Sequence, residues 1–276
     1  MNQLQVEDLK ILKVLDEFCS KYDLEYFLYA GTLLGAVRHQ GFIPWDDDVD
    51  IAMTRETFNN FEKKIIKSDL LNNGFHFQSN RYSDYYSSQI SKLRSNTLNI
   101  KENVSQTQHG YHGPWVDIFP LDNIPDDEKL REKQFKQVFF YNRIIAIFQL
   151  VKVKENDKGI KRKIKSFMQK FNEKFYKRYF FMNFLYKRRL HHMTKYNDQE
   201  TKACAEMAYM FFNKAADFNK NIITKKEISN FKRVPFENTT AMVPTKSHSI
   251  LKRKFNDYMK LPPEEERKKH QIDYLY

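Results

Sequence analysis

Residues 31–51 read GTLLGAVRHQGFIPWDDDVDI and end with four aspartates within five positions. Carboxylates this close repel one another unless a cation lies among them, so the run indicates a metal site. If residues 46–53 form a strand, alternate side chains share a face, and these include Asp46, Asp48 and Asp50. Oxygen ligands on a rigid strand suit Mg²⁺ or Mn²⁺, which leave coordination positions for substrate phosphates. The run therefore predicts a phosphoryl-transfer site.

Two other interpretations of the aspartates remain open. The D-x-D-x-D spacing matches the first ligand positions of an EF-hand calcium loop, but the position that needs glycine is Ile51 and the twelfth position, which needs glutamate, is Thr57. The run could also be a solvated turn before a helix. The apolar residues on either side argue against a free loop, so we favour the catalytic metal.

The composition of the whole chain indicates one mixed domain with an added helical region, because 276 residues can bury a sizeable core. A hydrophobic content of 41% and an aromatic content of 15% exclude a disordered protein. Cys19 and Cys204 lack nearby partners, so we expect reduced packing residues. The polar start and the interrupted apolar run at 138–151 predict a cytoplasmic protein without a membrane span.

Apolar spacing and alternation predict the order of the elements. Helices are expected at residues 4–19, 33–39 and 55–66. Further strands are expected at residues 26–30, 86–94 and 115–119. We expect a core sheet over about 20–124 and a mainly helical part over about 125–276. Within the latter, 125–232 reads as a helical insertion, and the last helix is expected to stop at the Pro-Pro pair at 262–263.

Asp117 is the natural partner of the acidic run. It lies among apolar residues of a predicted strand, where burying a carboxylate is costly unless a cation or hydrogen-bond donors meet it. The alternative is an aspartate at the end of an edge strand. We expect Asp48, Asp50 and Asp117 to be the metal ligands.

Small and aromatic residues near the acidic run are candidates for substrate contacts. Gly31 and Thr32 stand where backbone N–H groups at a helix start could meet phosphate oxygens. Trp45 could stack on a base or sugar, although packing is the commoner role for an aromatic beside a proline. His109 and His112 lie in a loop before Asp117. They could approach the acceptor of the transferred phosphate, or they could remain solvated.

Three basic side chains are candidates for phosphate contacts. Arg38 could bind phosphate in a bidentate manner, or form an internal salt bridge to Asp46 or Asp47. Lys92 and Arg94 alternate on a predicted strand, so both could face the donor phosphates, or both could be surface charge.

Most of the net charge of +12 belongs to residues 152–190, which hold fourteen Lys or Arg against three acids. Aromatic residues recur there at near-helical spacing. The segment could be a solvated helix face, a nucleic-acid patch or a surface that contacts anionic membrane. Nucleic acid is the least favoured of the three, and a lipid contact would suit an enzyme with a lipid-linked acceptor.

Taken together, three blocks of the chain resemble the LicD family of phosphotransferases, relatives of fukutin. They are residues 31–50, the VDIFPLD block at 116–122 and the DYMKLPP block at 257–263. The resemblance runs from about residue 5 to about residue 270, although 125–230 matches in character only. Where the family tends to have Tyr-Gly-Asp, this chain has an asparagine, Asn256, which tolerates a left-handed turn better than most residues.

The resemblance implies an α+β fold of the nucleotidyltransferase type, similar to DNA polymerase β, in one LicD-type catalytic domain over 1–276. It also implies transfer of phosphocholine or an alditol phosphate from a CDP-linked donor such as CDP-choline. The acceptor would be a sugar hydroxyl of a surface glycan, such as a capsule or teichoic acid, or of its lipid-linked oligosaccharide precursor. True nucleotidyl transfer is the alternative, and a non-catalytic basic adaptor is a third.

In the expected mechanism, Asp48, Asp50 and Asp117 hold one or two divalent ions that offset charge on the leaving CMP. Either Asp117 or Asp46 would accept the proton of the acceptor hydroxyl. The transferred group, the acceptor sugar and the choice between Mg²⁺ and Mn²⁺ are left open by the sequence.

Overall fold

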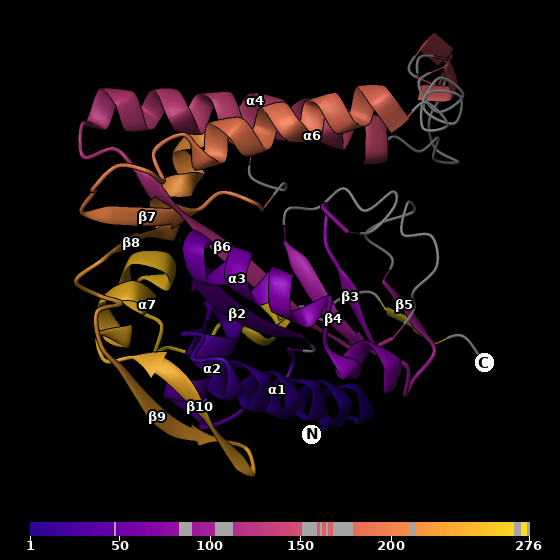
Figure 1. Ribbon diagram of the computed structural model, residues 1–276, viewed down its shortest axis with the longest axis vertical. Coiled ribbons are helices and arrows are strands. Elements are labelled where there is room, and N and C mark those ends of the chain that lie inside the picture. The colour runs from indigo at the N-terminus through magenta and orange to yellow at the C-terminus, as the bar shows by residue number, and fades with distance from the viewer. Residues whose placement is uncertain are drawn as a thin grey trace.

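A computed structural model describes residues 1–46, 48–82, 90–102, 113–150, 159–160, 162–163, 165–167, 179–209, 213–267 and 272–274 (Figure 1). Several predicted features lie outside these residues. They are Asp47, His109, His112 and most of the basic segment 152–190.

The core is a mixed sheet, as predicted, with the strand order β1-β2-β6-β4-β3 and with β7 and β8 added beside β6. Its strands are β1 (Phe27–Leu28), β2 (Val49–Thr54), β3 (Phe75–Gln78), β4 (Ser91–Ser95), β6 (Trp115–Ile124), β7 (Ala203–Glu206) and β8 (Ile222–Thr224). The central pair, β2 and β6, is parallel, whereas the other strand pairs described in this sheet are antiparallel.

Helices surround this sheet, and two small antiparallel pairs lie apart from it. The α-helices are α1 (Gln3–Lys21), α2 (Ala30–His39), α3 (Arg55–Ile65), α4 (Glu128–Leu150), α6 (Tyr179–Thr194) and α7 (Ser247–Phe255). The short 3₁₀ helices are η1 (Asp69–Asn72), η2 (Ala215–Asn221) and η3 (Glu264–Glu266). The small pairs are β9 (Phe231–Phe236) with β10 (Thr239–Pro244), and β5 (Ile100–Glu102) with β11 (Ile272–Tyr274).

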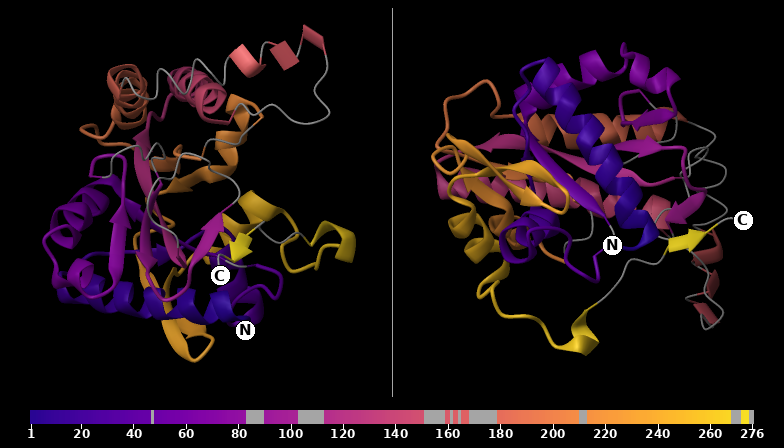
Figure 2. Two further views of the ribbon diagram at one scale, coloured as in Figure 1. Left: turned by 90° about the vertical axis from the view of Figure 1, so that its right-hand side faces the viewer. Right: turned by 90° about the horizontal axis from the view of Figure 1, so that it is seen from below.

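Helix α1 begins at a capping box in which Asn2 and Gln5 satisfy each other's backbone N–H groups, each at 2.9 Å. Its apolar side is buried against the sheet. Helices α1 and α3 cover one face of the sheet, and α7 lies toward the other (Figure 2). A bidentate pair between Arg55 and the fully buried Asp122, with both bonds at 2.7 Å, ties α3 to β6.

Helices α4 and α6 pack against each other in a separate layer along the edge of the sheet that carries β7 (Figures 1 and 2). The pair has its own small core around Ile145, Met182 and Leu185. Across the described ranges, no helix has the length and apolar character needed to cross a bilayer.

Several boundaries differ from the prediction. The segment 125–232 is not uniformly helical, because β7 and β8 lie within it and extend the core sheet beyond residue 124. The part after it also contains the β9–β10 hairpin. Strand β2 begins at Val49 rather than at residue 46, and the last helix ends at Phe255, well before the Pro-Pro pair. The predicted helices 4–19, 33–39 and 55–66 correspond to α1, α2 and α3.

Candidate metal and substrate site

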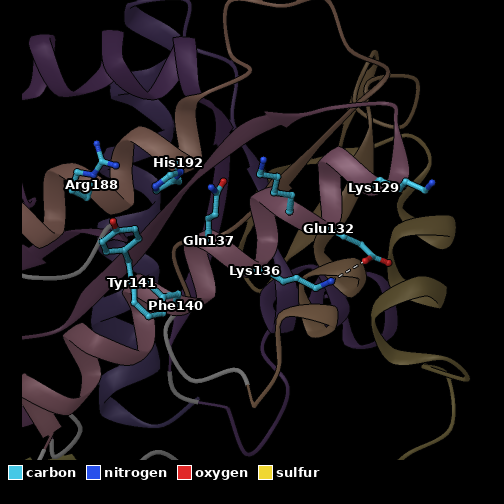
Figure 3. A pocket seen from close by; sticks show the side chains of 9 residues that line it. Lys129, Glu132, Lys136, Gln137, Phe140, Tyr141, Arg188 and His192 are labelled. Carbon is cyan, nitrogen blue, oxygen red and sulfur yellow. Dashed lines mark hydrogen bonds and ion pairs between the residues drawn. The ribbon is translucent and has the colours of Figure 1, made fainter.

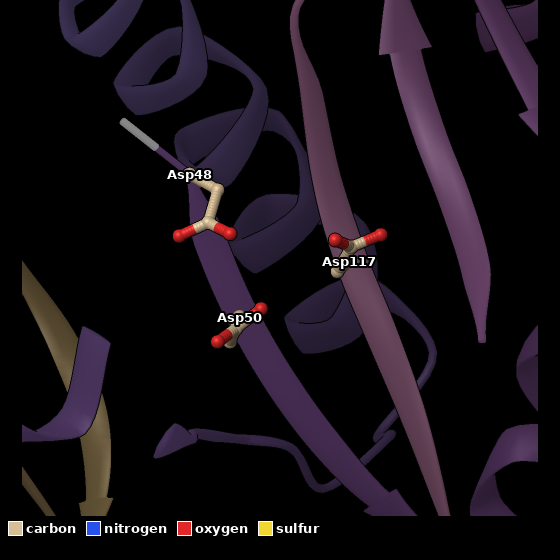
Figure 4. A group of neighbouring side chains, drawn as sticks. All are labelled: Asp48, Asp50 and Asp117. Carbon is tan, nitrogen blue, oxygen red and sulfur yellow. The ribbon is translucent and has the colours of Figure 1, made fainter. Parts of the chain in front are cut away.

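Three aspartates meet on the two parallel strands at the centre of the sheet. Asp50 of β2 is in register with Asp117 of β6, and Asp48 directly precedes β2 on the same side (Figure 4). One carboxylate oxygen from each of the three lies within 4.8 Å of the others. Carboxylates gathered in this way are suitable ligands for a divalent cation with oxygen preference. We call these three residues the triad.

The electrostatics of the triad also favour a cation. Burial holds the pKa of Asp50 well above its usual range, and the charges of Asp48, Asp117 and Asp46 raise it further. Both effects penalise the ionised carboxylate, and a bound divalent ion would offset both. The chemistry of the donor set therefore fits Mg²⁺ or Mn²⁺.

Lys92 of β4 adds a positive charge next to Asp117. It is opposite Asp117 in the antiparallel register, and its Nζ lies 2.7 Å from Asp117 Oδ1. The same ammonium lies 4.6 Å from the centroid of the Trp115 ring. Lys92 thus lies beside Asp117 on the strand next to β6.

The backbone around Asp50 is fixed by α2 and the residue before it. The Thr32 hydroxyl accepts a hydrogen bond from the Asp50 N–H at 2.8 Å, and the Tyr29 N–H donates to the Asp50 carbonyl at 2.9 Å. Thr32 is buried, and its side chain positions the strand.

Helix α1 holds in place the backbone before β2 and the backbone at the start of β6, through two buried polar side chains. Gln5 donates from Nε2 to the carbonyl of Asp46 at 2.7 Å, and Asp8 accepts from the Trp115 N–H at 2.9 Å. Neither residue is predictable from the sequence, because both look like ordinary polar positions of an amphipathic helix.

Asp46 lies beside the first turn of α2 rather than within the triad. A Cβ built on Gly31 would stand 2.7 Å from Asp46 Oδ2, so only glycine allows this approach. The carboxylate of Asp46 therefore lies at the turn that was predicted to meet substrate phosphate. A helix N-terminus favours such a negative charge.

Two predicted phosphate contacts have mainly structural partners. Arg94 is 2% exposed and donates to Gln78 Oε1 at 2.6 Å and to the Gly113 carbonyl at 2.8 Å. A buried guanidinium with protein acceptors favours a structural role over the predicted phosphate contact. Arg38 donates to His39 Nε2 at 2.9 Å and to the Tyr258 carbonyl at 2.7 Å, which ties α2 to the segment after α7.

Trp45 is half-buried next to the acidic run. The guanidinium of Arg267 lies 4.8 Å from its ring centroid, and the His39 ring stands edge-on at 6.4 Å. These contacts match the packing alternative for Trp45, with one face covered by the C-terminal segment.

A mostly buried polar cluster that no local sequence pattern predicts adjoins the triad from the far end of the chain. Lys254 of α7 donates to Asn221 Oδ1 at 2.5 Å and to the Tyr29 hydroxyl at 3.3 Å, and its Nζ stands 4.6 Å from the Tyr29 ring centroid. Burial lowers the pKa of Lys254, whereas the charges of Glu206 and Asp50 raise it. The ammonium is thus an electrostatic neighbour of the triad.

Glu206 completes this cluster from β7. It accepts from the Tyr209 N–H at 2.7 Å and from Asn221 Nδ2 at 2.8 Å. Burial raises its pKa to about 7, against the opposing charge of Lys254. The only sequence signal for Glu206 was an acid within the short apolar run at 203–208, and Lys254 had none beyond its place just before the C-terminal block.

Comparison with known proteins agrees with this geometry. Residues 23–143 match the family model described as LicD/FKTN/FKRP, nucleotidyltransferase domain. The chain is 26% identical over 286 residues to the lipopolysaccharide cholinephosphotransferase LicD of Haemophilus influenzae, covering 99% of this chain and 97% of that protein. Uncharacterized proteins of Rickettsia typhi and Rickettsia prowazekii are 44% and 49% identical over 54 and 47 residues, which is 20% and 17% of this chain and 18% of each relative.

Proposed function

The chain belongs to the LicD family, and on that premise we propose that it is a metal-dependent phosphotransferase. It moves phosphocholine, or an alditol phosphate, from a CDP-activated donor to a sugar hydroxyl of a cell-surface glycan or its lipid-linked precursor. The observation that carries the proposal is the triad, whose oxygens lie within 4.8 Å of one another on adjacent parallel strands. The name of the Haemophilus influenzae relative supports phosphocholine as the first group to test.

We infer a nucleotidyltransferase-like core and one catalytic domain over the whole chain. The family description supports the first inference. For the second, β7 and β8 come from the later half of the chain and yet pair into the core sheet, and Lys254 of α7 reaches the surroundings of Asp50. Both halves therefore contribute to one site.

Asp48, Asp50 and Asp117 would hold Mg²⁺ or Mn²⁺, which when bound neutralises phosphate oxygens of the donor and the charge on departing CMP. Lys92 pairs with Asp117 at 2.7 Å and adds positive charge on the side of β4. Lys254 adds a second fixed positive charge from the side of α7. Fixed charges of this kind act most strongly in a site shielded from water.

We assign the proton acceptor for the attacking sugar hydroxyl to Asp46. Asp117 is paired with Lys92 and would be a metal ligand, and both roles compete with accepting a proton. Asp46 is the remaining described carboxylate of the run, close enough to affect the pKa of Asp50. It lies beside the N-terminus of α2 and outside the triad, so the role of general base is assigned to it.

Nucleotidyl transfer is the second candidate, because the matching family model is described as a nucleotidyltransferase domain. The two reactions break different bonds of the donor. The phosphotransferase leaves a substituted phosphate on the glycan and releases CMP, whereas the alternative leaves a nucleoside monophosphate on its acceptor and releases the substituted phosphate, which is phosphocholine when the donor is CDP-choline.

The test is to incubate the protein with CDP-choline, CDP-glycerol or CDP-ribitol and a glycan acceptor, with and without Mg²⁺ or Mn²⁺. Metal-dependent CMP release from one donor, with the matching mass added to the acceptor, would establish the reaction. An Asp48→Asn, Asp50→Asn variant should release none. A nucleotide mass on the acceptor would overturn the proposal in favour of nucleotidyl transfer.

We place the reaction at the cytoplasmic face of the membrane, where a lipid-linked precursor is accessible.

A further inference from the structure

Helix α4 exposes one continuous stripe of basic and large apolar side chains. Its members, spaced three or four residues apart, are Lys129, Lys133, Lys136, Phe140, Arg143 and Ile147. Residues at this spacing lie on one side of a helix. Phe140 is 58% exposed and Ile147 is 40% exposed, although both are large enough to favour burial.

Helix α6 exposes a similar stripe. It consists of Phe184, Lys187, Arg188 and His191, with Phe184 51% exposed. Each of the two helices therefore presents at least one uncovered aromatic side chain among basic residues.

Part of each stripe borders one groove between the two helices, so the stripes meet on one surface of the molecule (Figure 3). The groove has a volume of about 720 Å³, and the stripe residues that line it are Lys129, Lys133, Lys136 and Phe140 of α4 and Arg188 of α6. The rings of Tyr141 and His192 stack inside it with centroids 5.3 Å apart. We call the two stripes and this groove the α4–α6 surface.

Charge on the α4–α6 surface is predominantly positive. Six of its residues are Lys or Arg, and the exposed acids of α4 beside them are Glu128 and Glu132. Glu132 pairs with Lys136 at 3.1 Å. Basic residues around exposed apolar side chains are the pattern by which helices bind the interface of anionic membranes.

We propose that the α4–α6 surface docks on an anionic lipid bilayer, with Phe140, Ile147 and Phe184 inserted among the lipids. The proposal rests on the proposed function, because it would bring the enzyme to a lipid-linked acceptor. An aliphatic tip such as Ile147 gains little from nucleic acid but gains free energy in the acyl region, so a bilayer fits better than RNA or DNA.

The geometry also agrees with a lipid-linked glycan. Strand β6 leads from Asp117 toward the start of α4, and the seven steps from Asp117 to Ile124 span about 23 Å at roughly 3.3 Å per step. The reacting sugar would then lie several sugar units from the membrane rather than directly at the lipid.

The test is sedimentation of the full chain with vesicles of phosphatidylglycerol and phosphatidylcholine, compared with phosphatidylcholine alone. We expect binding only to the anionic vesicles. The Lys133→Glu, Lys187→Glu variant should bind at least about 25-fold more weakly, since each basic residue is worth roughly fivefold. A Phe140→Ser, Phe184→Ser variant should also bind more weakly, and the matched charge control Lys63→Glu, Lys67→Glu should bind as the unchanged protein does.

Failure to bind anionic vesicles would overturn the proposal, as would equal losses in the control. Binding of an RNA duplex that is lost in the Lys133→Glu, Lys187→Glu variant, without vesicle binding, would identify a nucleic-acid surface instead. The Asp48→Asn, Asp50→Asn variant should bind vesicles normally, and the surface variants should release CMP normally from soluble donor. Vesicle sedimentation and CMP release therefore separate a failure of membrane docking from a failure of the proposed reaction.

Discussion

Lys254 and Asp50 come from opposite ends of the chain and act on each other electrostatically. Because a nearby cation opposes a second one, Lys254→Met should tighten Mn²⁺ binding about fivefold to tenfold. It should also slow CMP release by at least about tenfold, because a fixed charge beside the donor phosphates is lost. Calorimetry and a CMP assay would measure the two effects.

Lys252→Met, an exposed change on the same helix, is the control for that experiment. If Lys254→Met leaves metal affinity and turnover both unchanged, Lys254 has a packing role only. Loss of metal binding would contradict the electrostatic account, because removing a cation should not weaken a cation site.

The burial of Glu206 should make the free energy of unfolding depend on pH. Its pKa is raised by burial to about 7, from an ordinary value of 4.5, so the native state holds a proton that the unfolded chain releases. The stabilisation is fully present below pH 4.5 and is lost as pH rises through about 7. The loss is up to about 3 kcal/mol. Urea unfolding at pH 5.5 and pH 8 would measure it.

Glu206→Gln imitates the protonated acid and should remove most of this dependence. Its free energy of unfolding should change less between the two pH values than that of the unchanged protein. An equal change in both proteins would show that Glu206 is not the group responsible.

At the scale of the element, the end of α7 carries a local strain. Asn256 has φ 56° and ψ −117°, a conformation that glycine adopts readily and other residues do not. Asn256→Gly should therefore stabilise the protein by about 1 kcal/mol, and Asn256→Ala should destabilise it by a similar amount. Urea unfolding of the two variants decides this, and a glycine variant less stable than the alanine variant would contradict it.

The elements with strong periodicity were predictable, and the shortest strands were not. Helices α1 and α3 bury residues at helical spacing, so the apolar pattern predicts them well. Strand β7 reads Ala-Cys-Ala-Glu, a composition compatible with a helix, and it is a strand because it pairs with β6 and β8. Pairing of this kind is decided by tertiary contacts and not by the local sequence.

At the scale of the whole molecule, some residues of the site could be predicted from the sequence and others could not. The aspartates were visible because four carboxylates crowd one run and Asp117 lies alone in an apolar strand. Glu206 and Lys254 reach the same region from positions about 90 and 140 residues beyond Asp117, and no local pattern marks them. Alternation correctly put Lys92 and Arg94 on one face, but β4 carries Arg94 past the triad to Trp115.

The most direct test of the account is calorimetric titration of the metal-free protein with Mn²⁺, with and without CDP-choline. The account predicts saturable binding that is lost in an Asp50→Asn, Asp117→Asn variant and kept in Asp69→Asn, an exposed control. The first variant should remain folded, because neutralising Asp50 and Asp117 relieves repulsion at buried carboxylates. Mn²⁺ binding that persists unchanged in the triad variant, or that is absent from the unchanged protein even with CDP-choline present, would contradict the central claim that these aspartates form the metal centre of a phosphotransferase.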